Sequence, residues 1–225
     1  MIKGIDVSHW RGEIDWAQVA QSGVKFAFCK SSGGVSYADP TYKRNIQGCK
    51  DNGIIYGAYH YFYPFLGGRK QAEYFISVIG DDYQLPPVID SERAYGESYA
   101  TVAQRTLEAL QEVERLTGTK PLLYCGSWFG SKLGLCHEYD LWLAHYTTGN
   151  PGVPAAWDNW TFWQYSERGK VPGVPGYCDL NWWHGTLLQL QKYANIQQEE
   201  PEIYKAEINI PKSAEVINLT IHRKL

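Results

Sequence analysis

The sequence lacks any apolar run that approaches the ~20 residues a membrane-spanning helix needs. It also lacks an excess of basic residues, because 21 Lys and Arg stand against 24 Asp and Glu and the formal net charge is −3. No basic footprint for nucleic acid results from such a balance. The first residues do not combine a basic segment with an apolar core, so we expect a chain made in the cytoplasm without a signal peptide.

Metal-ligand spacing is also missing. The five cysteines follow no Cys-x-x-Cys pattern: Cys29, Cys49, Cys125, Cys136 and Cys178. An odd, scattered set predicts free thiols in a reducing compartment. The six histidines are dispersed, and His60 and His145 belong to no His-x-His or His-Glu-x-x-His motif. We therefore predict neither a metal nor another cofactor.

What the sequence does contain is a regular alternation of strand and helix patterns. Eight strands are predicted at residues 2–7, 24–30, 54–62, 85–92, 121–125, 141–146, 161–165 and 177–182. Helices are predicted at 16–20, 40–52, 69–79, 99–116 and 185–193, with only a helical turn near 128–133. The last three strands are joined by Gly/Pro-rich loops too short for full helices. This order predicts an α/β fold, an irregular TIM-like (β/α)5(β)3 barrel with a parallel sheet and a short C-terminal extension.

The character of the chain changes after the last predicted helix. We expect residues 1–194 to form the barrel, and residues 195–225 to form a polar linker followed by a short β-like tail. Residues 207–210 and 216–221 alternate like two short strands. Because a lone hairpin is marginal in water, this tail is predicted to pack on the barrel or to mediate self-association.

Asp90 and Glu92 end the most unusual stretch, which begins with two prolines at 86 and 87 and continues through Val88 and Ile89. On a strand, residues i and i+2 share a face, roughly 6.5–7 Å apart. Two carboxylates on one face tend to separate in pKa, which provides one acid and one base or nucleophile. Glycoside hydrolysis requires such a pair, although a bare Asp-x-Glu is also typical of a solvated strand end.

Two further acids belong with this pair in a barrel. Active sites of such folds lie at the C-terminal ends of the strands. Asp6 is near the end of the first predicted strand and fits this rule. Asp179 lies early in the last predicted strand, which does not fit the rule.

Several segments together resemble family 25 of the glycoside hydrolases, the muramidases (lysozymes) of phages and bacteria. They occur in the family's order and cover roughly residues 2 to 193. The segments are Gly4-Ile5-Asp6-Val7-Ser8-His9-Trp10, Ala58-Tyr59-His60-Tyr61-Phe62, Val88-Ile89-Asp90-Ser91-Glu92, Trp142-Leu143-Ala144-His145-Tyr146, Trp163-Gln164-Tyr165-Ser166 and Cys178-Asp179-Leu180-Asn181. The resemblance implies the same (β/α)5β3 barrel.

The resemblance also implies roles for the acids. Glu92 would be the general acid that protonates the glycosidic oxygen. Asp90 would act either as nucleophile or by steadying the N-acetyl group of the sugar as that group attacks its own anomeric carbon; strand spacing fits both routes. Asp6 and Asp179 would be outer carboxylates that raise the pKa of Glu92 and stabilise an oxocarbenium-like transition state.

Aromatic and amide side chains of the same segments are candidates to line the sugar groove, although part of this set could equally belong to the barrel core. They are Tyr61, Tyr124, Trp142, Gln164 and Tyr165. The sequence departs from the family pattern at Arg11-Gly12, at Ser32-Gly33-Gly34 and at His145, which affects contacts to the glycan and leaves the paired acids in place.

The implied activity is that of an N-acetylmuramidase that cuts the β-1,4 bond between N-acetylmuramic acid and N-acetylglucosamine in peptidoglycan. The missing signal peptide favours a phage or prophage endolysin that reaches the wall through a holin pore, and a bacterial enzyme with another export route is the alternative. One alternative is a non-catalytic wall-binding module, which predicts loss of a site acid, whereas all four remain. The other is a chitinase-like hydrolase, whose motif would need acids at Leu85 and Val88.

Overall fold

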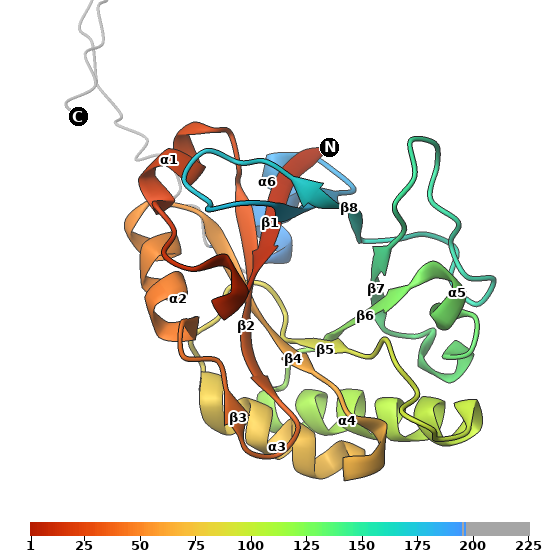
Figure 1. Cartoon of the computed structure of the whole chain (residues 1–225). Helices are drawn as coiled ribbons and strands as arrows, with labels where there is room; N and C mark the ends of the chain where they lie inside the picture. Colours follow the sequence, from red (N-terminus) through yellow and green to blue (C-terminus); the bar gives the residue numbers. More distant parts are fainter. Residues whose placement is uncertain (195, 197–225) are drawn as a thin grey trace, which may run out of the picture.

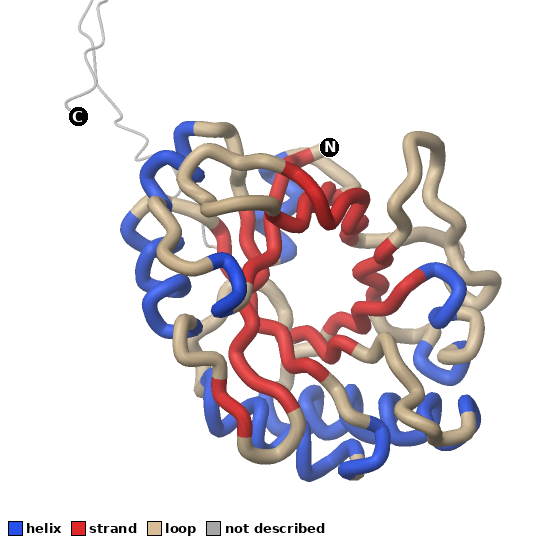
Figure 2. The backbone as a smooth tube through the Cα atoms, in the orientation of Figure 1, coloured by secondary structure: helices blue, strands red, loops and turns tan. Residues whose placement is uncertain are grey.

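The computed structural model of the chain describes residues 1–194 and residue 196. Eight of its strands close into a barrel, and helices lie outside it (Figures 1 and 2). The barrel strands are β1 (Ile2–Val7), β2 (Phe26–Gly33), β4 (Ile55–Tyr61), β5 (Val88–Asp90), β6 (Leu122–Gly126), β7 (Asp140–Ala144), β8 (Phe162–Gly169) and β9 (Cys178–Trp183). The barrel closes because β1 pairs with both β9 and β2. The predicted irregular barrel is confirmed.

The helices follow the first strands and then become short. They are α1 (Trp16–Gln21), α2 (Tyr42–Asp51), α3 (Gly68–Ile79), α4 (Tyr99–Thr117), α5 (Ser127–Gly130) and α6 (Leu187–Tyr193), with 3-10 turns η1 (His9–Arg11), η2 (Pro64–Leu66) and η3 (Gly134–Cys136). Among the described residues, none of these helices combines the length and apolarity that a bilayer crossing requires.

Local sequence explains where the helices start. Asp15 caps α1 by accepting a hydrogen bond from the Gln18 backbone N–H, as its position before the helix predicts. The helix predicted at 40–52 begins later, at Tyr42, because Asp39 accepts hydrogen bonds from both the backbone N–H and the hydroxyl of Thr41. Those bonds form a turn that precedes the helix.

Two strand predictions were wrong in ways that matter for the site. The sheet is not wholly parallel, because β9 runs antiparallel to both β1 and β8. The strand predicted at 85–92 is only three residues long, so Glu92 lies in the loop after β5. A short strand, β3 (Tyr37–Ala38), was not predicted and pairs with the end of β2.

Two apolar clusters hold the barrel. One lies between the strands and the helices and includes Ile5, Phe75 and Leu110. The other fills the barrel interior with large rings, of which Phe28 and Trp142 stack with centroids 4.4 Å apart. The interior is therefore solid below the rim, and an open site can form only at an end of the barrel.

The last described residues belong to the barrel body. Tyr193 and Ile196 pack against the interior cluster. The predicted linker and β-like tail, residues 195 and 197–225, lie outside the described residues.

Candidate active site

A cavity of about 220 Å³ opens where β1, β2, β4, β5, β6 and β7 present their C-terminal ends. Its lining is rich in acids and aromatic rings. It comprises Asp6, Ser8, Trp10, Arg11, Lys30, Tyr59, Tyr61, Asp90, Glu92, Tyr124, Trp142, Tyr146, Gln164 and Asp179. All four predicted acids and four of the five predicted sugar contacts therefore line one cavity, and Tyr165 is placed elsewhere.

Asp90 is the last residue of β5 and is nearly fully buried in the cavity wall. Its backbone carbonyl accepts a hydrogen bond from Phe62, which fixes the strand end. The side-chain atom Oδ1 is buried and has no hydrogen-bond partner among the described residues. Burial, and then the charge of Glu92, raise the pKa of Asp90 well above its usual range, and Lys30 opposes them.

Glu92 lies two residues further on and is partly exposed. Ser91, between the two acids, donates its backbone N–H to the Tyr124 carbonyl, and its hydroxyl is hydrogen-bonded to Thr106 of α4. These contacts turn Ser91 away from the cavity and leave both acids lining it. Burial raises the pKa of Glu92, while Arg93 and a hydrogen bond with the Tyr61 hydroxyl lower it. The buried carboxyl and the accessible carboxyl thus form a coupled pair.

Asp6 faces this pair from the end of β1. Its Oδ2 accepts hydrogen bonds from Gln164 Nε2 and Asn181 Nδ2, both at 2.8 Å. Burial, followed by the charge of Asp179, raises the pKa of Asp6 to about 8 in spite of these two bonds. This raised pKa favours the protonated form of Asp6 at neutral pH.

The reversal of β9 explains the position of Asp179. In the antiparallel pairing Asp179 stands opposite Asp6, so the beginning of β9 lies beside the end of β1. Arg11 Nη2 donates to Asp179 Oδ2 at 2.7 Å. Burial raises the pKa of Asp179, and the bond and charge of Arg11 oppose this effect. The residue that departs from the family pattern, Arg11, is thus paired inside the site.

Gln164 connects one wall of the cavity to the other. Its Oε1 accepts hydrogen bonds from the hydroxyls of Tyr124 and Tyr146, each at 2.8 Å. With the oxygen occupied in this way, the amide nitrogen points to Asp6. Trp142 makes a similar link, because its indole N–H donates to Asn181 Oδ1 at 2.7 Å.

Six lining residues were not predicted as site residues: Ser8, Trp10, Arg11, Lys30, Tyr59 and Tyr146. Neither was Asn181, which is hydrogen-bonded to Asp6. Lys30 Nζ lies 4.6 Å from the centre of the Tyr61 ring, and its charge reaches both Asp90 and Glu92. Asn181 had a usable signal, since it alternates with Asp179 on one strand. Lys30 and Tyr146 lie near predicted strand ends. Arg11 stood out only as a departure from the family pattern, and its pairing with Asp179 could not be predicted because the two residues are distant in sequence.

The two histidines considered for metal binding have other partners. His60 is buried outside the cavity, with Nδ1 hydrogen-bonded to Ser32, and burial lowers its pKa to about 3. His145 Nδ1 accepts the backbone N–H of Gly152 and fixes a loop. Within the described part of the chain, no group of three or more His, Cys, Asp and Glu is arranged to hold a metal ion.

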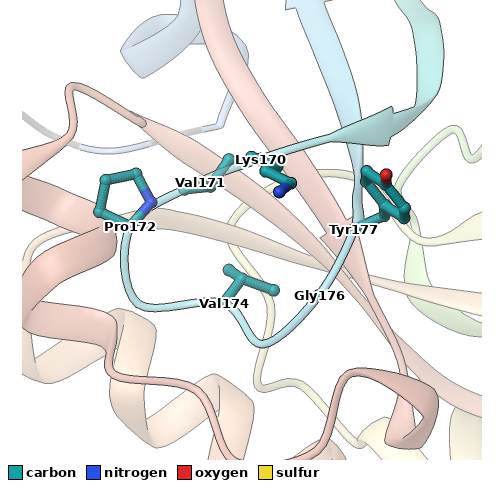
Figure 3. Close-up of a pocket in the computed structure, with 6 residues that line it drawn as sticks. All are labelled: Lys170, Val171, Pro172, Val174, Gly176 and Tyr177. Carbon is teal, nitrogen blue, oxygen red and sulfur yellow. The ribbon is translucent and has the colours of Figure 1, made fainter.

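Other hollows lie apart from the acids. One is formed by the loop between β8 and β9, where Lys170 and Tyr177 lie at the two ends of the loop (Figure 3). Its described lining includes no carboxylate and shares no residue with the acid-lined cavity. Tyr165 lines a different groove, on the outside of β8 and β9.

A closed α/β barrel with two interacting carboxyls in a cavity at its rim has the arrangement that glycoside hydrolysis requires. Residues 5–174 match the sequence profile described as Glycosyl hydrolases family 25. The chain is 35% identical to "Lysozyme M1" of Streptomyces globisporus over 210 residues, which cover 86% of this chain and 71% of that protein. It is 37% identical over 212 residues to "Uncharacterized protein YegX" of Escherichia coli K12, covering 89% and 76%.

The fold comparison agrees. The crystal structure of the bacterial lysozyme from Streptomyces coelicolor superposes with a TM-score of 0.80 and 32% identity, covering 86% of this chain and 97% of that one. The chain therefore belongs to family 25 of the glycosyl hydrolases, and it is a hydrolase of the lysozyme type.

Proposed function

We propose that this chain is an N-acetylmuramidase that hydrolyses the β-1,4 bond between N-acetylmuramic acid and N-acetylglucosamine in bacterial peptidoglycan. Lysozyme-type activity on peptidoglycan is what family membership supports. The observation that carries the proposal is the coupled pair Asp90 and Glu92 in one open cavity. The reaction needs one proton donor and one anion. Burial favours the neutral form of Asp90, whereas Lys30 and the cationic transition state favour its anion, which leaves the proton on Glu92.

Glu92 is proposed as the general acid. The acid must reach the glycosidic oxygen, and Glu92 is the more exposed member of the pair. Its raised pKa keeps the carboxyl protonated at a higher pH than an exposed glutamate would allow. Arg93 and the Tyr61 hydroxyl, which lower that pKa, favour the anion after the proton has been transferred.

Asp90 is proposed to act on the sugar's N-acetyl group. Its buried Oδ1 has no hydrogen-bond partner in the described chain, and burying an unpaired acceptor costs free energy. An amide N–H of substrate would satisfy that oxygen and hold the acetyl oxygen toward the anomeric carbon. Direct nucleophilic attack by Asp90 uses the same placement, and the two routes differ in whether a covalent sugar–Asp90 species forms.

Asp6 and Asp179 are proposed to set the charge of the site. Asp179 is compensated by Arg11, and the raised pKa of Asp6 favours its neutral form, so the two residues exert less negative charge than two bare carboxylates would. The remaining negative charge favours the cationic transition state. Tyr61, Tyr124 and Trp142 are proposed to contact the sugar, and Gln164 to fix the walls around it.

The decisive experiment compares wild type with Glu92→Gln on purified peptidoglycan. Removing the proton donor should lower reducing-end release by at least about 10²-fold, the usual scale of general acid catalysis. Mass spectrometry of the wild-type products should show N-acetylmuramic acid at the new reducing end. Products that end in N-acetylglucosamine, or release that survives Glu92→Gln, would contradict the proposal.

We propose further that the enzyme serves as a phage or prophage endolysin, made in the cytoplasm and released to the wall through a holin. Expression in a bacterial host with and without a co-expressed holin tests this setting. Lysis that requires the holin is expected. Lysis of equal rate without a holin would point to another export route.

A further inference from the structure

A second groove, of about 1120 Å³, lies on the outer wall of β8 and β9. Its floor is an aromatic pair: the rings of Tyr165 and Trp182 stack with centroids 5.1 Å apart and an angle of 11° between their planes. Trp163 adjoins Tyr165 at 5.8 Å. The loop after β7 supplies the opposite side, with Thr148 and Asn150 exposed.

The lining has the chemistry of a neutral, hydroxyl-rich ligand. Flat rings accept the apolar face of a sugar ring, while hydroxyl and amide side chains can hydrogen-bond its edge. Among the described residues that line the groove, no side chain is charged. The lining also includes Met1, whose backbone ammonium is the one charged group there among the described residues. A polyamine would find no counter-charge, whereas a saccharide needs none.

The outer groove adjoins the catalytic cavity and shares one lining residue with it. Tyr146 lines both, and its side chain is half exposed. Its hydroxyl is held by Gln164 Oε1, so the ring stands at a fixed place on the ridge between the two hollows. A polymer that occupies the cavity can therefore continue over Tyr146 onto the outer wall.

We propose that this outer groove is a second binding site for the glycan strand of peptidoglycan, occupied by sugars of the strand that is being cut in the cavity. The proposal rests on the proposed function for the identity of the ligand. It also assigns a sugar contact to Tyr165, which was predicted as one and does not line the catalytic cavity. The site would hold the enzyme on long strands and would add little for fragments too short to reach past Tyr146.

Binding without turnover tests the proposal. The full chain with Glu92→Gln is sedimented with insoluble peptidoglycan, and its Kd is compared with that of the same chain carrying Tyr165→Ala or Tyr165→Phe. Loss of the ring should raise the Kd about three- to tenfold, whereas Phe keeps the stacking face and should leave the Kd unchanged. Thermal unfolding checks that each variant is folded.

A second variant changes the opposite side of the groove, in the loop after β7. Thr148→Trp fills the groove from an exposed loop and does not disturb the core, so it should raise the Kd to a similar extent. The proposal is overturned if Tyr165→Ala and Thr148→Trp both bind like the Glu92→Gln parent. It is also overturned if a chain ending at Ile196 binds more tightly while Tyr165→Ala has no effect in the full chain, because the C-terminal segment would then cover the groove.

A different result would contradict the proposed function and leave the outer binding site standing. If wild type releases no reducing ends while Tyr165→Ala still weakens sedimentation, the chain binds the wall through this groove without cutting it.

Discussion

Asp6 shows how a single residue can couple the site to the stability of the fold. The chain buries it between two amide donors and beside the like charge of Asp179, and the charge of Arg11 offsets these effects only in part. Sequence identified Asp6 as a site residue but could not give its protonation state, because Gln164 and Asn181 lie more than 150 positions away.

This placement predicts a pH-dependent stability. In the unfolded chain Asp6 ionises near pH 3.8, whereas in the folded chain it keeps its proton to about pH 8. Asp6 binds more protons in the folded state between these values, so its contribution to the free energy of unfolding should fall as the pH rises from about 4 to about 8. Buried His60 contributes with the opposite sign below about pH 6.5, so the effect of Asp6 is measured as a difference between variants. Asp6→Asn should flatten this slope, which urea denaturation at pH 5 and pH 8 measures. A residual slope is expected from Asp90, whose pKa is also raised.

A matched control is Asp15→Asn. Asp15 is an exposed cap whose pKa is lowered by its bonds to Gln18, so this change should not reduce the slope between pH 5 and pH 8. An unchanged slope in Asp6→Asn would show that Asp6 is ionised throughout that range in both states.

Among the elements, β5 and β9 show what sequence could and could not predict. The prolines and branched residues correctly located β5, and the paired acids were found through it. Glu92 does line the same cavity as Asp90, as predicted, but not because the two residues share one face of a strand. The strand β5 ends at Asp90, and the loop after it brings Glu92 to the cavity. For β9, alternation predicts a strand but carries no information on direction, which depends on its pairing with β1 and β8.

The tight approach of β1 to the barrel interior gives a prediction for Gly4. A Cβ at this position would lie 2.3 Å from the fully buried ring of Phe26. Since that ring is packed on all sides, Gly4→Ala should destabilise the fold by about 1–3 kcal/mol, measured by chemical denaturation. Gly134→Ala is the control, because its added Cβ would make an ordinary 3.6 Å contact and should change little. Equal stabilities for the two variants would contradict the packing described for β1.

For the whole molecule, the described body reaches two residues beyond the predicted barrel boundary, since Ile196 packs on the interior cluster. We propose that residues 1–196 fold and hydrolyse peptidoglycan alone, and that the remaining tail mediates self-association. A chain ending at Ile196 should keep the unfolding temperature and activity of the full chain. Light scattering after size-exclusion chromatography should show an oligomer only for the full chain. A full-length monomer would refute self-association.

The pairing of β1 with β9 has a consequence for the synthesis and folding of the enzyme. Asp6 and Asp179 belong to the first and last strands, and they meet only when the ring of strands closes. Closing so long a loop is entropically costly and comes late in folding. A chain whose synthesis has not yet reached β9 lacks Asp179 and cannot assemble the cleft, so it is inactive. Activity regained during refolding should accordingly lag behind the return of helical signal.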